Sequence, residues 1–187
     1  MYLDVFNNVI NSDDFTVGGG SASALAGAMA AGMVSMVAKL SMAKPVALTV
    51  EDYQSISKEA DELAQILLKG SVSDTEAYCM IKDAFALPKS TDEEKAIRKQ
   101  AVQDAAYQAA VVPMTNGYND KKVYDLACRL VNASNPGCTS DLMSAKYLSE
   151  AGVKGCALNI EANLSMIKDE ARINELTAAM EELKKSV

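Results

Sequence analysis

Three glycines and a serine, Gly18 to Ser21, stand directly before an alanine-rich apolar stretch. Glycine lets the backbone approach a ligand closely, and the first N–H groups of a helix have no partner inside the helix. Such a turn can bind an anion or the polar edge of a ring. Its spacing matches neither common nucleotide-binding glycine pattern, and no strand is expected before it, so a nucleotide loop is not indicated. A flexible lead-in to the helix is the alternative interpretation.

Acid–base chemistry in this chain must use residues other than histidine, because the chain has none. That work would fall to Asp, Glu, Lys, Tyr or Cys. The four cysteines contain no CxxC pair, so a zinc site is not indicated and no metal is expected. They are interpreted as reduced core thiols of a cytoplasmic protein rather than as nucleophiles, since none has a histidine partner. They are Cys79, Cys128, Cys138 and Cys156.

The distribution of charge argues against two classes of partner. The net charge is −7, with acidic residues spread along the chain and no cluster of Lys or Arg. Nucleic acid and anionic membrane surfaces are therefore not expected as partners. The segment from Phe15 to Ala38 has no charged residue and is long enough to span a bilayer, but it consists largely of Gly, Ala and Ser. A central helix buried by other helices is the favoured interpretation.

The elements that must position these groups are predicted to be helices. Apolar residues are 49% of the chain but aromatic residues only 5%, a composition that favours closely packed helices over sheets. Pro113 is expected either to kink its helix or to begin a new one, and Gly70 marks a possible kink. Thr49 with Asp52, and Ser90 or Thr91 with Glu93 or Glu94, are expected N-caps, as is Thr139 or Ser140. The predicted helices cover residues 2–10, 21–43, 49–87, 90–112, 118–133, 139–151 and 158–185, the last being one helix or two.

Taken together, these patterns predict one domain over residues 1–187. Its expected fold class is all-α, an antiparallel bundle of long helices. Uncharged helical surface between Ser21 and Ala43 is hard to cover with so few aromatic residues, so we expect a homodimer or a larger assembly of identical chains.

One segment is specific enough to indicate a relationship: Val17-Gly-Gly-Gly-Ser-Ala-Ser-Ala-Leu-Ala-Gly-Ala, followed by Val34 to Leu40. It resembles the opening of the cyclodeaminase domain of formiminotransferase-cyclodeaminase, a family that includes free-standing methenyltetrahydrofolate cyclohydrolases. One departure is Val17, where the family usually has a proline. The resemblance covers nearly the whole chain, and its further segments come in the expected order: residues 74–78, 87–88 with 94–98, 109–113, 140–141 and 159–164.

The resemblance implies a dimeric helical enzyme that binds reduced folate, in its monoglutamyl or polyglutamyl form, near the glycine turn. One family reaction closes 5-formimino-tetrahydrofolate to the 5,10-methenyl form with loss of ammonia. The other opens the methenyl bridge with water to give 10-formyl-tetrahydrofolate. No cofactor beyond the folate substrate is expected. Both reactions pass through a tetrahedral carbon between two nitrogens, so protons must move and a cationic amidine must be stabilised.

Candidate roles follow from the family-like segments. Asp74 and Asp141 are the candidate acid–base groups, since a carboxylate suits a cationic substrate. Each has a structural alternative: Asp74 could be only a surface charge at a helix kink, and Asp141 could only stabilise the first turn of its helix. Lys39 is a candidate for protonating a leaving amine. Alternatively, Lys39 and Lys44 could bind the glutamate tail of folate, or both could be solvated surface lysines.

Asn159 and Asn163 are four residues apart and therefore share a helical face. Their amides could form hydrogen bonds with the donor and acceptor groups of a pterin ring, or they could form hydrogen bonds with buried backbone groups instead. With Gly18, Gly19, Gly20 and Ser21 they form the expected substrate-binding set. Two other functions stay open: a catalytically weak or inactive folate-binding or small-molecule-binding member of the same fold, and a purely structural helical partner.

Overall fold

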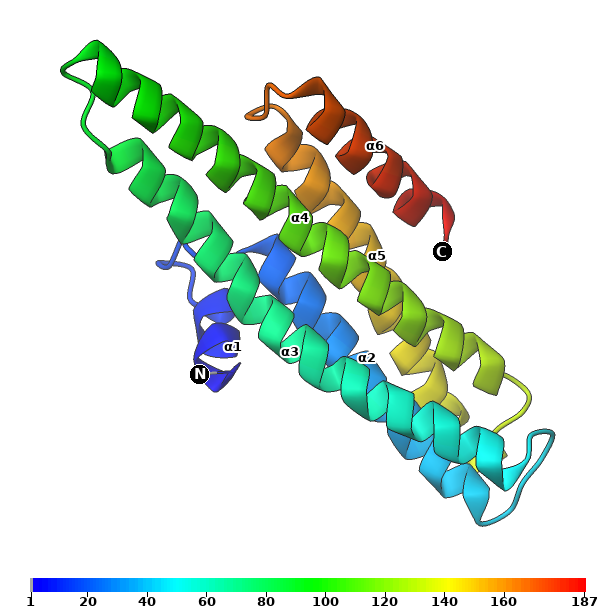
Figure 1. The fold of residues 1–187 in the computed structure, drawn as a ribbon. Helices are drawn as coiled ribbons and strands as arrows, with labels where there is room; N and C mark the ends of the chain where they lie inside the picture. Colours follow the sequence, from blue (N-terminus) through cyan, green and yellow to red (C-terminus); the bar gives the residue numbers. More distant parts are fainter. Residues whose placement is uncertain (1) are drawn as a thin grey trace.

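The protein is described here from a computed structural model that covers residues 2–187. Within this range the expected all-helical class is confirmed, since no residue forms a strand. Figure 1 shows α3 and α4 side by side as the longest elements, with α2 and α5 packed along them and α1 and α6 at the periphery. The elements are α1 (Tyr2–Ile10), α2 (Gly19–Met42), α3 (Val50–Ala86), α4 (Asp92–Leu130), the 3₁₀ helix η1 (Pro136–Cys138), α5 (Thr139–Leu164) and α6 (Glu170–Lys185).

Helix α2 lies at the centre of the bundle, where it contacts α3, α4 and α5. It is long and apolar enough to cross a membrane, but 61% of its most apolar window is buried inside the structure. Its inward positions are mainly alanine, serine and valine, and small side chains allow neighbouring helices to approach closely. In this structure the charge-free segment is therefore a core helix.

Two of the predicted helix starts are confirmed as complete capping boxes. Thr49 accepts a hydrogen bond from the backbone N–H of Asp52, and the Asp52 carboxylate accepts one from the Thr49 N–H. Thr91 and Glu94 form the same arrangement at the start of α4. Each box satisfies two N–H groups that the helix leaves without a partner. The overlapping Ser90–Glu93 box is not used.

The predicted cap at the start of α5 is wrong. Cys138 occupies the capping position without a side-chain bond, and Thr139 already belongs to the helix. The Thr139 hydroxyl instead donates to the Pro136 carbonyl. The reason is that η1 leads directly into α5, so no extended residue is left there to act as a cap.

Two predicted helix breaks are absent among the residues that the structure describes: α4 continues through Pro113 rather than beginning a new helix there, and α5 continues through Gly152 and Gly155. Helix α3 runs through Gly70 as one helix, as predicted. The glycines mark close contacts instead: a Cβ at Gly70 would lie 2.0 Å from the Asn116 amide oxygen. The C-terminal part does divide, because α5 ends at Leu164 and Asp169 caps α6.

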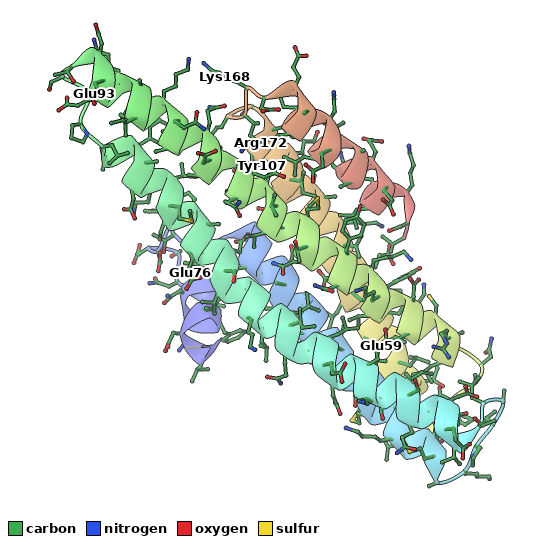
Figure 2. The ribbon with its side chains drawn as sticks, viewed as in Figure 1. Glu59, Glu76, Glu93, Tyr107, Lys168 and Arg172 are labelled. Carbon is green, nitrogen blue, oxygen red and sulfur yellow. The ribbon has the colours of Figure 1, made fainter. Side chains whose placement is uncertain are left out.

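The α3–α4 hairpin extends beyond the first turn of α2. Asp74 of α3 lies beside Gly20, near the start of α2, and α3 continues from there to Ala86. Helix α6 covers the neighbouring part of α4, where Arg172 stacks 4.4 Å from the Tyr107 ring centre (Figure 2). The start of α2 is therefore flanked by longer helices, and this is where the candidate site lies.

Candidate functional site

A cleft of about 140 Å³ opens at the N-terminus of α2. The structure brings six predicted site residues to it, although they come from three helices and the turn before α2. They are Gly18, Gly19, Gly20, Asp74, Asn159 and Asn163, and the remaining lining residues are Phe15, Thr16, Tyr78 and Ala109. The cleft therefore combines helix N-terminal N–H groups, one carboxyl group, two amides and one phenol.

The Asp74 carboxyl group is held against the first turn of α2. Its Oδ2 accepts a hydrogen bond of 3.0 Å from the Ser21 hydroxyl, which also donates at 2.9 Å to the Ser71 carbonyl. A Cβ at Gly20 would lie 2.1 Å from Asp74 Oδ1, so only glycine leaves room for this carboxyl group. Ser21 is fully buried and does not line the cleft; it holds Asp74 rather than facing a ligand.

Burial raises the pKa of Asp74 above its ordinary value of 3.8, and the hydrogen bonds from Ser21 only partly offset this effect. Desolvation disfavours the charged form of a carboxyl group, whereas donated hydrogen bonds favour it. The result is a carboxyl group that exchanges its proton closer to neutral pH than an exposed aspartate does, as general acid–base work requires.

The two asparagines line the cleft, and their amide groups are held by backbone carbonyls. Asn159 donates its amide N–H to the Gly155 carbonyl at 2.8 Å, and Asn163 donates to the carbonyls of Ala109 and Asn159 at 3.0 and 2.9 Å. Because each NH₂ group is engaged by backbone carbonyls, each amide oxygen remains to accept from a ligand. The cleft is therefore rich in acceptors, which suits a ligand that carries N–H donors or positive charge.

Pro113 creates the carbonyl that anchors Asn163. Proline has no N–H, so in a helix the carbonyl four residues earlier loses its usual partner. In α4 that carbonyl belongs to Ala109, which lines the cleft and accepts the Asn163 hydrogen bond. Helix α4 therefore continues through Pro113, because Asn163 of α5 donates a hydrogen bond to the Ala109 carbonyl that the proline leaves without a partner.

We expect Pro113→Ala to raise stability and lower ligand affinity together. Alanine restores a backbone donor for Ala109 and removes the ring from the helix interior, a gain of up to about 3 kcal/mol. Competition for the carbonyl weakens the anchoring of Asn163 by about 1 kcal/mol, or roughly fivefold in affinity. Thermal unfolding and folate titration measure the two effects; a variant that binds as well as the parent would show that this anchor is dispensable.

The entry to the glycine turn is anchored by apolar packing. Val17, which stands where the related family usually has proline, is 7% exposed and packs in a cluster with Val5 and Leu25. Just before it, Thr16 bonds the Asp14 carboxylate through both its N–H and its hydroxyl. Burial of Val17 thus supplies a constraint on the turn that a proline ring would supply by fixing its own φ.

Four residues of the cleft were not among the predicted site residues: Phe15, Thr16, Tyr78 and Ala109. Tyr78 and Ala109 belong to family-like segments, and their positions carry a further signal. Tyr78 is four residues after Asp74 in a helix and so shares its face, and Ala109 is four residues before Pro113. Phe15 and Thr16 lie in an irregular segment whose path no periodic pattern specifies.

Two predicted catalytic residues, Lys39 and Asp141, lie outside the cleft. Lys39 is twenty residues beyond Gly19 in α2, about 30 Å along the axis, and forms a 2.7 Å ion pair with Asp61. Asp141 lies in the first turn of α5, eighteen residues from Asn159 and thus about 27 Å away. Within one chain Asp141 therefore does not reach the cleft that contains Asp74, because α5 carries its two ends to opposite ends of the bundle.

The fold and the cleft define a class: an all-helical protein with a small-molecule cleft that contains one acid–base group with a raised pKa. Comparison with known proteins specifies the family. The family description "Formiminotransferase-cyclodeaminase" matches residues 2–182. The chain belongs to this family, as its sequence segments suggested.

Individual relatives have two kinds of architecture. A methenyltetrahydrofolate cyclohydrolase from Methylorubrum extorquens is 34% identical over 182 residues, which are 97% of this chain and 88% of that protein. A formimidoyltransferase-cyclodeaminase from Gallus gallus is 30% identical over 90% of this chain but only 31% of its own length. The crystal structure of a formiminotetrahydrofolate cyclodeaminase from Thermotoga maritima has the same fold, with a TM-score of 0.79, 24% identity, and 95% and 89% of the two chains covered.

Proposed function

We propose that this protein is a one-carbon tetrahydrofolate enzyme that forms or hydrolyses the 5,10-methenyl bridge in the cleft at the start of α2. The observation that carries the proposal is the Asp74 carboxyl group, half-buried beside Gly20 with the acceptor oxygens of Asn159 and Asn163 in the same cleft. Membership of the family and the similarity to a cyclohydrolase along nearly the whole chain support the same substrate.

The arrangement suits the chemistry of a cationic carbon between two nitrogens. In hydrolysis, water adds to the methenyl carbon while Asp74 accepts one of its protons; the bond to N5 then breaks as the new hydroxyl gives its proton to N5. In cyclodeamination, N10 adds to the formimino carbon and the amine leaves as ammonia, carrying the proton that N10 gives up. In both, the carboxylate stabilises positive charge and moves a proton, while the asparagine oxygens accept from pterin N–H groups.

The experiment that tests the proposal gives the purified protein each substrate separately. Loss of methenyl absorbance above the uncatalysed rate measures hydrolysis, and ammonia release from 5-formimino-tetrahydrofolate measures cyclodeamination. The larger kcat/KM identifies the main reaction. Tight folate binding without either activity would favour the alternative of an inactive binding member, and no folate binding would favour a structural protein.

A basic groove next to the cleft supports a substrate with an anionic tail. It has a volume of about 510 Å³, and its floor is apolar, with Phe85, Val102 and Met166. Its rim carries five cationic side chains although the protein has a net charge of −7. They are Lys89, Lys95, Arg98, Lys99 and Lys168, the last at the α5–α6 turn (Figure 2).

The groove continues the cleft along α3 and α4. Tyr78 and Phe85 are seven residues apart on α3, and Ala109 and Val102 are seven apart on α4, so each pair shares a face at about 10 Å spacing. Lys95 pairs with Asp92, but Lys99 and Lys168 have no ion pair with any residue from 2 to 187. An aminobenzoyl group can cross the apolar floor, and the glutamate carboxylates can then meet the lysines. This groove, rather than Lys39 and Lys44 at the other end of α2, is our proposed tail site.

We expect the double variant Lys99→Gln, Lys168→Gln to bind oligoglutamyl folate about tenfold more weakly, from two exposed charge pairs of up to about 0.7 kcal/mol each. The monoglutamyl substrate should lose less, and added salt should reduce the difference. KM values for the two substrates measure the effect. The matched control is Lys58→Gln, Lys122→Gln, which removes the same charge elsewhere. Equal losses for both double variants would mean that the groove does not bind the tail.

We infer that two copies of the chain, each an antiparallel helical bundle, pair through α2. Met29, Met36 and Leu40 are 52%, 40% and 49% exposed on one face, and a Cβ at Gly32 between them would meet nothing within 4 Å. Four such positions at helical spacing form an apolar stripe that a second copy can cover. Sedimentation as a monomer at micromolar concentration would contradict the pairing.

Folate chemistry and reduced thiols also support a cytoplasmic location without a membrane or nucleic-acid partner.

A further inference from the structure

Asp120 is a carboxyl group in the middle of the core that the proposed chemistry does not use. It lies in the C-terminal half of α4 and is 0% exposed. Its Oδ1 has no hydrogen-bond partner in the described structure, and its Oδ2 accepts only a 3.6 Å contact from the Cys156 thiol. Such a group is costly to bury as a charge, so it must have a specific place in the packing.

Two glycines from different helices provide that place. A Cβ at Gly27 of α2 would lie 1.5 Å from Asp120 Oδ1, and a Cβ at Gly152 of α5 would lie 2.6 Å from Oδ2. The carboxyl group is therefore inserted at the contact between α2 and α5, against the main chain of both helices. Neither glycine can be replaced by a larger residue unless the carboxyl group moves.

This contact belongs to a row of close contacts between α2 and α5, here called the α2–α5 seam, that reaches the cleft. At its end, a Cβ at Gly19 would lie 3.2 Å from the Asn159 amide. One turn further, a Cβ at Gly155 would lie 2.1 Å from the Ser23 hydroxyl, which donates to the Gly19 carbonyl. The next contact along the seam is the one in which Asp120 lies between Gly27 and Gly152. Asp120 thus occupies the α2–α5 seam eight residues, or about 12 Å, from Gly19.

No cation compensates a charge at this position. Burial raises the pKa of Asp120 well above its ordinary 3.8, and burial likewise raises that of Cys156, so the protein interior favours the uncharged form of both groups. The titratable neighbour on α5 is Cys156. On α3 the nearby side chain is the apolar Leu67, and the titratable group is Asp74, whose charge raises the Cys156 pKa further. From α2 there is none before Lys39. Every titratable group that faces Asp120 is thus neutral or acidic.

We propose that Asp120 is a positioning residue for the cleft: its uncharged carboxyl group sets the spacing of α2 and α5, and loss of its proton opens this contact and separates Gly19 from Asn159. The inference that this affects folate binding rests on the proposed function, whereas the effect on the helix contact does not.

The pH dependence of unfolding tests the uncharged state. In the unfolded chain Asp120 ionises at ordinary acidic pH, whereas in the folded chain it keeps its proton to a higher pH, so its contribution to stability is present at low pH and lost as pH rises. Relative to Asp120→Asn, the parent should lose about 3 °C in Tm per pH unit as pH rises above the ordinary aspartate range, and the loss should level off once the folded carboxyl group ionises. Asp125→Asn, on the surface of the same helix, is the control. A Tm difference between parent and Asp120→Asn that does not change with pH would overturn the proposal.

A rescue experiment tests the geometry. Gly27→Ala should lower Tm by about 5–10 °C because its methyl group overlaps Oδ1, and the double variant Gly27→Ala, Asp120→Ala should recover part of this loss. Gly32→Ala, in the same helix with open space around it, should not lower Tm. If the double variant is less stable than Gly27→Ala alone, Asp120 does not occupy the seam as proposed.

Binding of 5-formyl-tetrahydrofolate at pH 6 and pH 9 tests the link to the cleft, since Asp74 is the same in parent and variant. We expect parent affinity to fall at least fivefold more than that of Asp120→Asn between these pH values. Parallel losses in both proteins would overturn the positioning role. If neither protein binds a reduced folate, the proposed function fails, while the unfolding and rescue measurements still decide whether Asp120 holds the seam.

Discussion

Replacing Asp74 with asparagine is expected to lower kcat/KM for methenyl hydrolysis and for formimino closure by about 100- to 10,000-fold, the range typical of a lost general acid–base group. Asparagine is nearly isosteric and can still accept the hydrogen bond from Ser21, so the fold should be kept. What is lost is the negative charge beside the cationic carbon and the ability to take up a proton. Steady-state kinetics with both substrates, and helicity as a folding control, measure the effect.

The pH profile of the parent gives an independent check on the same group. Because burial raises the pKa of Asp74, its ionised form should be lost as pH falls through a value above 3.8. The acid limb of kcat/KM should therefore lie at higher pH than for an exposed aspartate, and it should be missing in Asp74→Asn. A variant within about threefold of the parent, which is less than about 0.7 kcal/mol, would mean that Asp74 is not the acid–base group.

Gly20→Ala should be the second most damaging change to activity, with a loss of about 100-fold. Its methyl group would lie 2.1 Å from Asp74 Oδ1, so the carboxyl group must move away from the Ser21 hydroxyl. A displacement of about 1 Å of a catalytic group can cost this much rate. The cost in stability should be small, because the group that moves is the end of a side chain and alanine favours the helix.

Gly18→Ala is the matched control for this prediction. A Cβ at Gly18 would meet no protein atom within 4 Å and leaves Asp74 in place, so kcat should stay within about threefold of the parent, and any loss should appear in KM because Gly18 lines the cleft. Kinetics and thermal unfolding of the two variants separate a specific effect on Asp74 from a general effect on the glycine turn. Equal losses at both positions would indicate that the turn needs glycine for flexibility rather than for the carboxyl group.

Much of the secondary structure could be predicted from the sequence because its signals are local. The capping boxes at Thr49 and Thr91 require only residues three apart, and both are present. The sequence left open whether Pro113 kinks its helix or begins a new one, because continuation of α4 depends on Asn163, fifty residues later, which satisfies the freed Ala109 carbonyl. Gly152 likewise resembles a turn signal until Asp120 is seen to fill the space beside it. Local patterns do not contain such partners.

For the candidate site, the sequence supplied the groups but not the distances between them. The glycine turn, Asp74 and the two asparagines meet in one cleft because α2, α3 and α5 come together at the start of α2. Lys39 and Asp141 belonged to equally suggestive segments, yet each lies at the opposite end of its helix from the cleft. Which end of a helix meets which neighbour depends on helix lengths and connections, and periodicity does not give these.

The most direct test of the account compares the rate of methenyl absorbance loss for three proteins: the parent, Asp74→Asn and Asp141→Asn. If the cleft at the start of α2 is the reaction site, the parent exceeds the uncatalysed rate, Asp141→Asn stays within about threefold of it, and Asp74→Asn falls by about 100-fold or more. If Asp141→Asn loses activity while Asp74→Asn keeps it, the reaction takes place elsewhere and the central claim is wrong.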